Sequence, residues 1–133
     1  MSEMQPSAPA AAGVPGDPKG FEKFEAQLDE LLTQLIGEAA EVIRACTKMQ
    51  RFGPGGRDPK VKDGMLNHQA LAFELGQFFL VWEAINGLHV MLIRDEEVQA
   101  GKASKFEKLG RYLEHSRLEL RDGNVWTLQK EKP

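Results

Sequence analysis

Apolar residues recur every three or four positions from Phe21 to about Arg51, and this spacing predicts one long amphipathic helix. The apolar positions are Phe21, Phe24, Leu28, Leu31, Leu32, Leu35, Ala39, Val42, Ile43, Cys46 and Met49. The next segment, RFGPGGRDPKVKDG (51–64), contains two prolines and four glycines and predicts a loop. A second helix is predicted from Asn67, as its N-cap, to about Gln99. Its middle, LAFELGQFFLVWEAINGLHVMLI, is apolar on nearly every side, which is typical of a helix covered by neighbouring helices or by a second subunit.

The two ends of the chain have different patterns. Residues 1–20 are rich in proline, alanine and glycine and predict a disordered arm. The segment SKFE (104–107) has the form of a capping box and predicts that a short third helix begins at Ser104. The segment LELRDGNVWTL (118–128) predicts a β-hairpin, or alternatively a tail docked by Trp126. The expected organisation is an arm over 1–20, an all-α domain of long antiparallel helices over 21–121, and a tail or hairpin over 122–133.

The composition of the chain argues against several classes of function. The chain has 133 residues and a formal net charge of −3, so it lacks the basic field that grips duplex nucleic acid. A single cysteine, Cys46, excludes an intrachain disulfide, and its place in the apolar pattern favours a structural thiol. Glu74, Gln77 and Glu83 interrupt the most apolar run, so we expect no membrane span. The N-terminus also lacks the pattern of a signal peptide, and we expect a cytoplasmic protein.

Two glutamates lie beside the apolar stripe of the first predicted helix. At about 100° per residue, Val42 and Met49 fall within about 40° of Glu38. Glu41 lies about 60° to the other side. Both carboxylates are therefore expected to project into one crevice at the edge of the apolar face.

A third glutamate lies in the middle of an apolar stripe. Val81 and Ile85 fall within about 20° of Glu74 on the second predicted helix, and Gln77 adds a neutral oxygen one turn along. A buried carboxylate must be neutralised, paired or bound to a cation, because burying it alone costs several kcal/mol or more. Hard divalent cations such as Mg²⁺ take oxygen ligands of this kind. The alternative is that Glu74 pairs with a buried arginine.

For Glu38 and Glu41 the corresponding alternative is a solvated groove, in which they pair with Lys48 or Arg51. With the two helices antiparallel, the metal-site interpretation instead brings Glu38, Glu41 and Glu74 together near the middle of the pair. The pattern leaves both interpretations open.

The motifs EAAEVIRACTKMQRFG (38–53) and NHQALAFELGQ (67–77) resemble the MazG-like, all-α nucleoside triphosphate pyrophosphohydrolase superfamily. The likeness is strongest to its small single-domain forms from phage and bacterial genomes, and it covers about residues 24–115. The segment KFEKLGRYLEH (105–115) resembles the tail segment of those forms. The resemblance implies a MazG-like helical bundle completed by dimerisation. It also implies Mg²⁺ as the cofactor and a nucleotide substrate that is cleaved to a monophosphate and pyrophosphate.

The resemblance also implies roles for individual residues. Glu38 and Glu41 match the last two glutamates of the first family motif, as metal ligands and catalytic residues. Glu74 matches the glutamate of the second motif, and Gln77 stands where the family has an aspartate, offering a carbonyl oxygen but no charge. Gly37 stands where the family often has a further glutamate. Candidates for contacting the phosphates or the base are Lys48, Arg51, Asn67, Trp82, Lys105, Lys108 and Arg111. Each of these also fits a plainer role as a solvated charge, a helix cap or a core aromatic residue.

Three functions are consistent with these patterns. The first is a Mg²⁺-dependent nucleotide pyrophosphohydrolase. The second is a binding module that sequesters or senses a nucleotide on the same fold, with Gln77 as the mark of lost chemistry. The third is a helical oligomerisation protein whose buried glutamates are paired internally. In every case the apolar second helix predicts a homodimer or tetramer.

Overall fold

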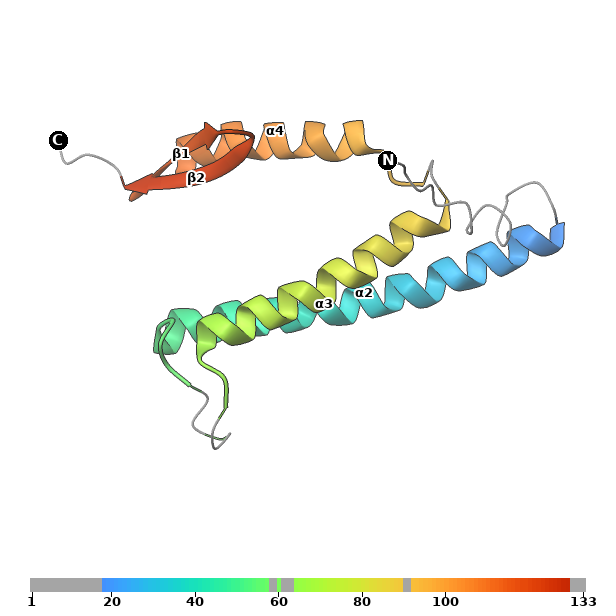
Figure 1. Ribbon diagram of the computed structural model, residues 1–133, viewed down its shortest axis with the longest axis horizontal. Coiled ribbons are helices and arrows are strands. Elements are labelled where there is room, and N and C mark those ends of the chain that lie inside the picture. The colour runs from blue at the N-terminus through green and yellow to red at the C-terminus, as the bar shows by residue number, and fades with distance from the viewer. Residues whose placement is uncertain (1–17, 58–59, 61–63, 90–91, 130–133) are drawn as a thin grey trace. The chain divides into compact units, whose positions relative to one another are not determined.

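The computed structural model describes residues 18–57, 60, 64–89 and 92–129. Figure 1 shows their elements, which in chain order are α2 (Pro18–Phe52), α3 (Asn67–Leu88), α4 (Asp95–Tyr112), β1 (Ser116–Arg121) and β2 (Asn124–Gln129). The chain is mostly helical, with one short antiparallel hairpin near its C-terminus. It divides into two compact units, Met1–Leu92 and Ile93–Pro133, here called the first and second unit. The helical domain predicted over 21–121 spans parts of both.

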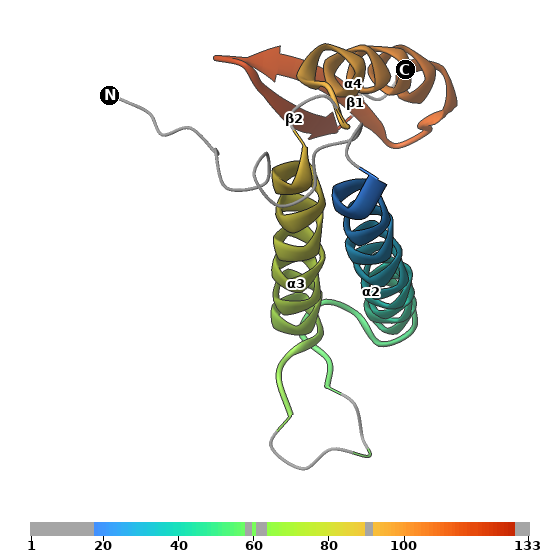
Figure 2. The same cartoon turned by 90° about the vertical axis from the view of Figure 1, so that its right-hand side faces the viewer.

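The first unit is an antiparallel pair of helices, α2 and α3 (Figure 2). The long amphipathic helix expected over 21–51 is confirmed as α2, which begins three residues earlier and ends one residue later. Residues 18–20, expected in the disordered arm, form its first turn, and residues 1–17 lie outside the described part. Phe24 and Ala45 of α2 and Ile85 of α3 are buried between the helices. The Phe24 ring also contacts the His89 ring edge-on, with centroids 6.2 Å apart.

Asn67 does not cap α3, because its side chain is hydrogen-bonded to the connection between the helices. Leu66 occupies the N-cap position, and Asn67 is the first helical residue. Asn67 is 3% exposed, and its Nδ2 donates to the Gly53 carbonyl oxygen at 3.0 Å. Its backbone N–H donates to the Gly56 carbonyl oxygen at 2.8 Å. A side chain at Gly56 would collide with the Phe52 carbonyl oxygen, so this connection requires a glycine there.

The second predicted helix is two helices, and its expected end at Gln99 is wrong. α3 ends at Leu88, after which His89 takes an extended conformation. α4 begins at Asp95, and its first turn holds three carboxylates that interact favourably with the helix dipole. The capping-box prediction at Ser104 is also wrong, because Ser104 lies inside α4. Three acidic residues in a row mark this helix start more strongly than the single serine does.

The second unit consists of α4 and the hairpin of β1 and β2 (Figure 1). The hairpin prediction is confirmed. Asp122 and Gly123 have φ values of 50° and 81°, which a two-residue hairpin turn of type I′ requires. The strand register places Leu120 opposite Val125. α4 packs against β1.

Candidate functional site

The candidate site lies in the first unit, around two buried carboxylate oxygens. Glu38 on α2 and Glu74 on α3 are both half-buried. The Oε2 atom of each is shielded from solvent and has no hydrogen-bond partner among the described residues. An unsatisfied buried acceptor costs about 1–3 kcal/mol, and more if it is charged. Gln27 Oε1 on α2 is a third buried side-chain acceptor without a partner in the described part, and of the three only Glu38 and Glu74 are carboxylates.

Glu41 has a partner, but a weak one. Its carboxylate lies 3.2 Å from Arg44 Nη1, one turn along the same helix. Both side chains are solvent-accessible, and a pair of this kind contributes only a few tenths of a kcal/mol. The ion pair with Arg44 therefore holds Glu41 loosely in its position beside Glu38.

Gln77 lies in a different environment from Glu74. Its side chain is exposed, whereas Glu74, one turn away, is half-buried. Within residues 18–57, 60, 64–89 and 92–129, no group of three or more histidine, cysteine, aspartate or glutamate side chains is arranged to hold a metal ion. The magnesium ligand set of Glu38, Glu41, Glu74 and Gln77 therefore stays a prediction.

The residues present nonetheless fit a hard divalent cation in their chemistry. Carboxylate oxygens are the donors that Mg²⁺ prefers, and Glu38 and Glu74 each have one such oxygen without a partner. Glu41 is one turn from Glu38 and is held only by its surface ion pair. Mg²⁺ commonly takes one or two protein carboxylates and keeps water or phosphate oxygens in its other positions. Two half-buried carboxylates, each with one shielded oxygen, suit this mode of binding.

The phosphate and base candidates divide between the two units. Lys48 and Trp82 are half-buried in the first unit, and Arg51 is exposed in the last turn of α2. The Arg51 guanidinium lies 5.1 Å from the centre of the Phe52 ring, a cation–π contact. The Asn67 amide is buried and hydrogen-bonded to Gly53, so it contributes to the helix connection.

The other three candidates belong to α4 in the second unit. Lys105 and Lys108 are exposed, and Arg111 forms a 3.7 Å ion pair with Glu107.

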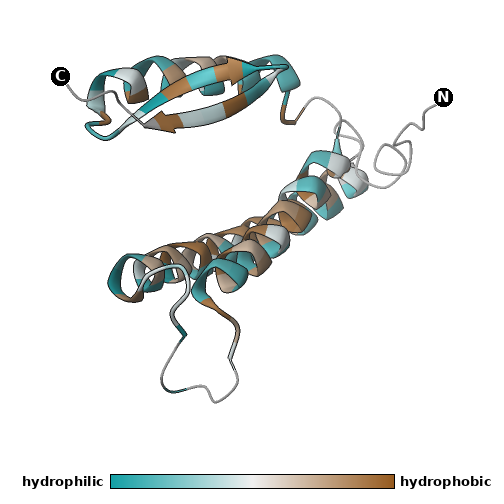
Figure 3. Ribbon diagram, turned by 60° about the vertical axis from the view of Figure 1, so that its left-hand side comes forward, coloured by the Kyte–Doolittle hydropathy of each residue, from teal (hydrophilic) through white to brown (hydrophobic). Residues whose placement is uncertain are grey.

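The first unit also exposes large apolar side chains. Figure 3 colours hydrophobic residues brown, and brown segments recur along α2 and α3. Ile36 on α2 is 72% exposed, and Leu80 on α3 is 67% exposed. Leu32 and Ile43 on α2 and Phe73 and Phe79 on α3 are exposed as well. Several large exposed apolar side chains on one compact unit often mark an interaction site. The all-round apolar pattern of the second predicted helix indicated the exposed apolar residues of α3. Ile43 belongs to the apolar positions of the first predicted helix, but nothing singled out Ile36 on α2.

Cys46 is exposed rather than buried, so its expected role as a core thiol is not supported by its position. None of the helices in the described part has the length and apolar character needed to cross a bilayer. Comparisons of the chain with protein-family models, with curated proteins and with solved structures find no match.

Proposed function

We propose that this protein is a Mg²⁺-dependent nucleotide pyrophosphohydrolase that cleaves a ribo- or deoxyribonucleoside triphosphate, or a related nucleotide, to a monophosphate and pyrophosphate. The observation that carries the proposal is the pair of buried, unpartnered carboxylate oxygens on Glu38 and Glu74. A stable fold retains such atoms at a cost, and the cost is explained if they bind a cation. The resemblance of segments 38–53 and 67–77 to the MazG-like superfamily agrees with this interpretation.

Each side chain then has a defined task. Bound Mg²⁺ supplies charge neutralisation of the phosphate oxygens. Glu38 and Glu74 would hold the ion, and Glu41, solvent-accessible and loosely paired with Arg44, would accept the proton of the attacking water. Arg51, exposed at the end of α2, neutralises the outer phosphates.

The proposed enzyme is a homodimer or tetramer. Exposed side chains such as Ile36 and Leu80 would be covered if the helix pair packs against a second copy. Covering them removes apolar area from water at about 25 cal/mol per Å², which favours association. The same packing would exclude water from the region of Glu38 and Glu74 and so strengthen their interaction with a cation.

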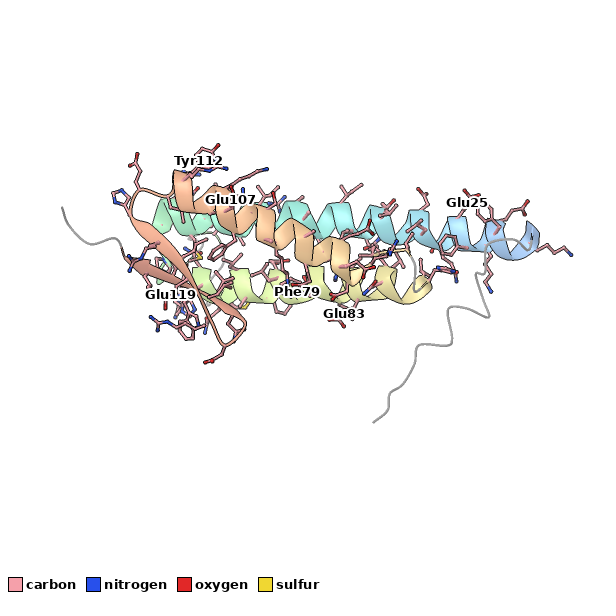
Figure 4. All side chains as sticks on the ribbon, turned by 90° about the horizontal axis from the view of Figure 1, so that it is seen from above. Glu25, Phe79, Glu83, Glu107, Tyr112 and Glu119 are labelled. Atoms are coloured by element: carbon pink, nitrogen blue, oxygen red, sulfur yellow. The ribbon has the colours of Figure 1, made fainter. Side chains whose placement is uncertain are left out.

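The test combines pyrophosphate release with thermal stability, using a panel of nucleoside triphosphates with and without Mg²⁺. We expect release that requires Mg²⁺ and is lost in Glu41→Ala. We also expect Glu74→Gln to lose the stabilisation by Mg²⁺, because a ligand that binds only the folded state raises its stability. Glu83→Gln is the matched control, since Glu83 is an exposed glutamate on the same helix (Figure 4). Equal Mg²⁺ stabilisation of wild type and Glu74→Gln would refute the metal site.

A second candidate is a nucleotide-binding module with little or no turnover. The exposed, uncharged Gln77 favours it, because Gln77 stands where the family motif has an aspartate and cannot act as a base. In Gln77→Asp, a binding module that has lost its chemistry is expected to gain pyrophosphate release, whereas an adapted enzyme changes little. Stabilisation by one nucleotide without product would also favour the binding module. No response to any nucleotide or to Mg²⁺ would leave an oligomerisation protein.

A further inference from the structure

The second unit contains a groove between α4 and the β-hairpin. Its volume is about 670 Å³, which lies in the range of small-molecule sites. The residues that line it are Gln99, Lys102, Ala103, Lys105, Phe106, Leu109, Leu118, Leu120, Gly123, Asn124 and Val125. All of them belong to residues 93–133, so the groove lies within one compact unit.

The groove exists because the hairpin has more apolar surface than α4 covers. Leu118, Leu120 and Val125 share one face of the hairpin, since opposite residues and alternate residues point to the same side. α4 packs against β1, with Phe106 and Leu109 half-buried. Leu120 and Val125 nevertheless remain 59% exposed. Within the second unit, these two side chains form an apolar wall that α4 does not cover.

The charges that line the groove are all positive. Lys102 and Lys105 are its ionisable residues, and no acidic side chain lines it. On α4, Lys102 lies within about 40° of Phe106, so it is on the apolar face of the helix. Neither lysine forms an ion pair within the described part of the chain, whereas Arg111 pairs with Glu107. Figure 4 shows Glu107 on the side of α4 away from the hairpin. Two uncompensated ammonium groups beside an apolar wall are complementary to an amphipathic anion.

We infer that the groove binds an aliphatic carboxylate, with its chain against Leu120, Val125 and Phe106 and its carboxylate at Lys102 and Lys105. The lining favours an aliphatic chain over a nucleotide, because its apolar side chains are leucine, valine and alanine with one aromatic ring. Apart from the two lysines, the polar side chains of the lining are the amides of Gln99 and Asn124, which are few for reading a base and a sugar. This site is independent of the proposed hydrolase site, which lies in the first unit.

The test is titration of the full chain with sodium decanoate, followed by calorimetry and by amide chemical shifts. We expect saturable binding with shifts at the hairpin and the middle of α4. The double substitution Lys102→Gln/Lys105→Gln should weaken binding roughly tenfold, as the loss of two partly exposed charge interactions predicts. Lys108→Gln is the matched control, because Lys108 makes the same charge change on the same helix about 160° from Phe106. Binding to Lys108→Gln should equal that of the wild type.

Further measurements separate the alternatives. Val125→Asp should abolish decanoate binding while circular dichroism shows the helices unchanged, and Glu74→Gln should leave it intact. Decylamine, with the same chain and the opposite charge, should bind much more weakly. Equal binding of decylamine, or equal weakening by Lys108→Gln, would overturn the inference. Displacement of decanoate by ATP, with the same dependence on Lys102 and Lys105, would also overturn it and make the groove a nucleotide site.

Discussion

Replacing Glu74 by methionine should stabilise the protein when no divalent cation is present. The Glu74 Oε2 atom is buried without a hydrogen-bond partner, at a cost of about 1–3 kcal/mol. Methionine is unbranched, has a similar helix propensity and fills irregular apolar space, so the substitution removes this cost without breaking α3. We expect the free energy of unfolding to rise by about 1–3 kcal/mol. The midpoint temperature should rise by about 3–5 °C per kcal/mol in a chain of this size.

The assay is urea unfolding followed by far-ultraviolet circular dichroism, in EDTA and in excess Mg²⁺. The wild type should gain stability on adding Mg²⁺, and Glu74→Met should be stable in EDTA and unresponsive to Mg²⁺. Glu83→Met makes the same chemical change at an exposed position of α3. We expect this control to change stability by no more than about 0.5 kcal/mol and to keep the response to Mg²⁺.

One result would refute the reasoning directly. If Glu74→Met loses about 3–5 kcal/mol in EDTA, Glu74 has a cationic partner in the folded assembly, because breaking a buried ion pair has a cost of that size. If Glu74→Met and the wild type have the same free energy of unfolding in both buffers, the Glu74 Oε2 atom is hydrated in solution. In either case the two unpartnered oxygens would no longer support a metal site.

Three other predictions follow from the described contacts. Asn67→Ala should lower the free energy of unfolding by about 1–3 kcal/mol, because it removes the buried hydrogen bond to the Gly53 carbonyl oxygen. Urea unfolding would measure this as a lower midpoint with an unchanged dependence of the free energy on urea concentration. Gly123→Ala should weaken the hairpin by about 1–2 kcal/mol, because Gly123 has a φ of 81°, and amide exchange should accelerate across β1 and β2 but not in α2 or α3. Cys46 is exposed one turn from the exposed Ile43, so maleimide should label it in the native state. If a second copy covers this side of α2, labelling should slow as protein concentration rises, and a rate independent of concentration would contradict that arrangement.

The sequence was sufficient for the elements whose signals are local. The recurrence of apolar residues every three or four positions predicted α2 to within three residues at its start and one residue at its end. Asp122 and Gly123 located the hairpin turn, since these residue types tolerate the positive φ values that the turn needs. The sequence did not predict the helix boundary correctly where two local signals indicated different boundaries. The apolar run continues past Leu88 and concealed the end of α3, although three acidic residues from Asp95 mark a new helix.

For the candidate site, the sequence by itself determined which side of each helix the glutamates lie on, because helical geometry converts spacing into angle. How deeply each glutamate side chain is buried depends on what the partner helix covers. Only the tertiary structure decided this burial. That structure left one oxygen each of Glu38 and Glu74 buried, while Gln77, one turn from Glu74, is exposed. In the tertiary structure, Asn67 also donates a hydrogen bond to the Gly53 carbonyl oxygen just after α2, instead of capping α3. The groove over Leu120 and Val125 exists only because α4 and the hairpin pack together, which no spacing along a single helix can reveal.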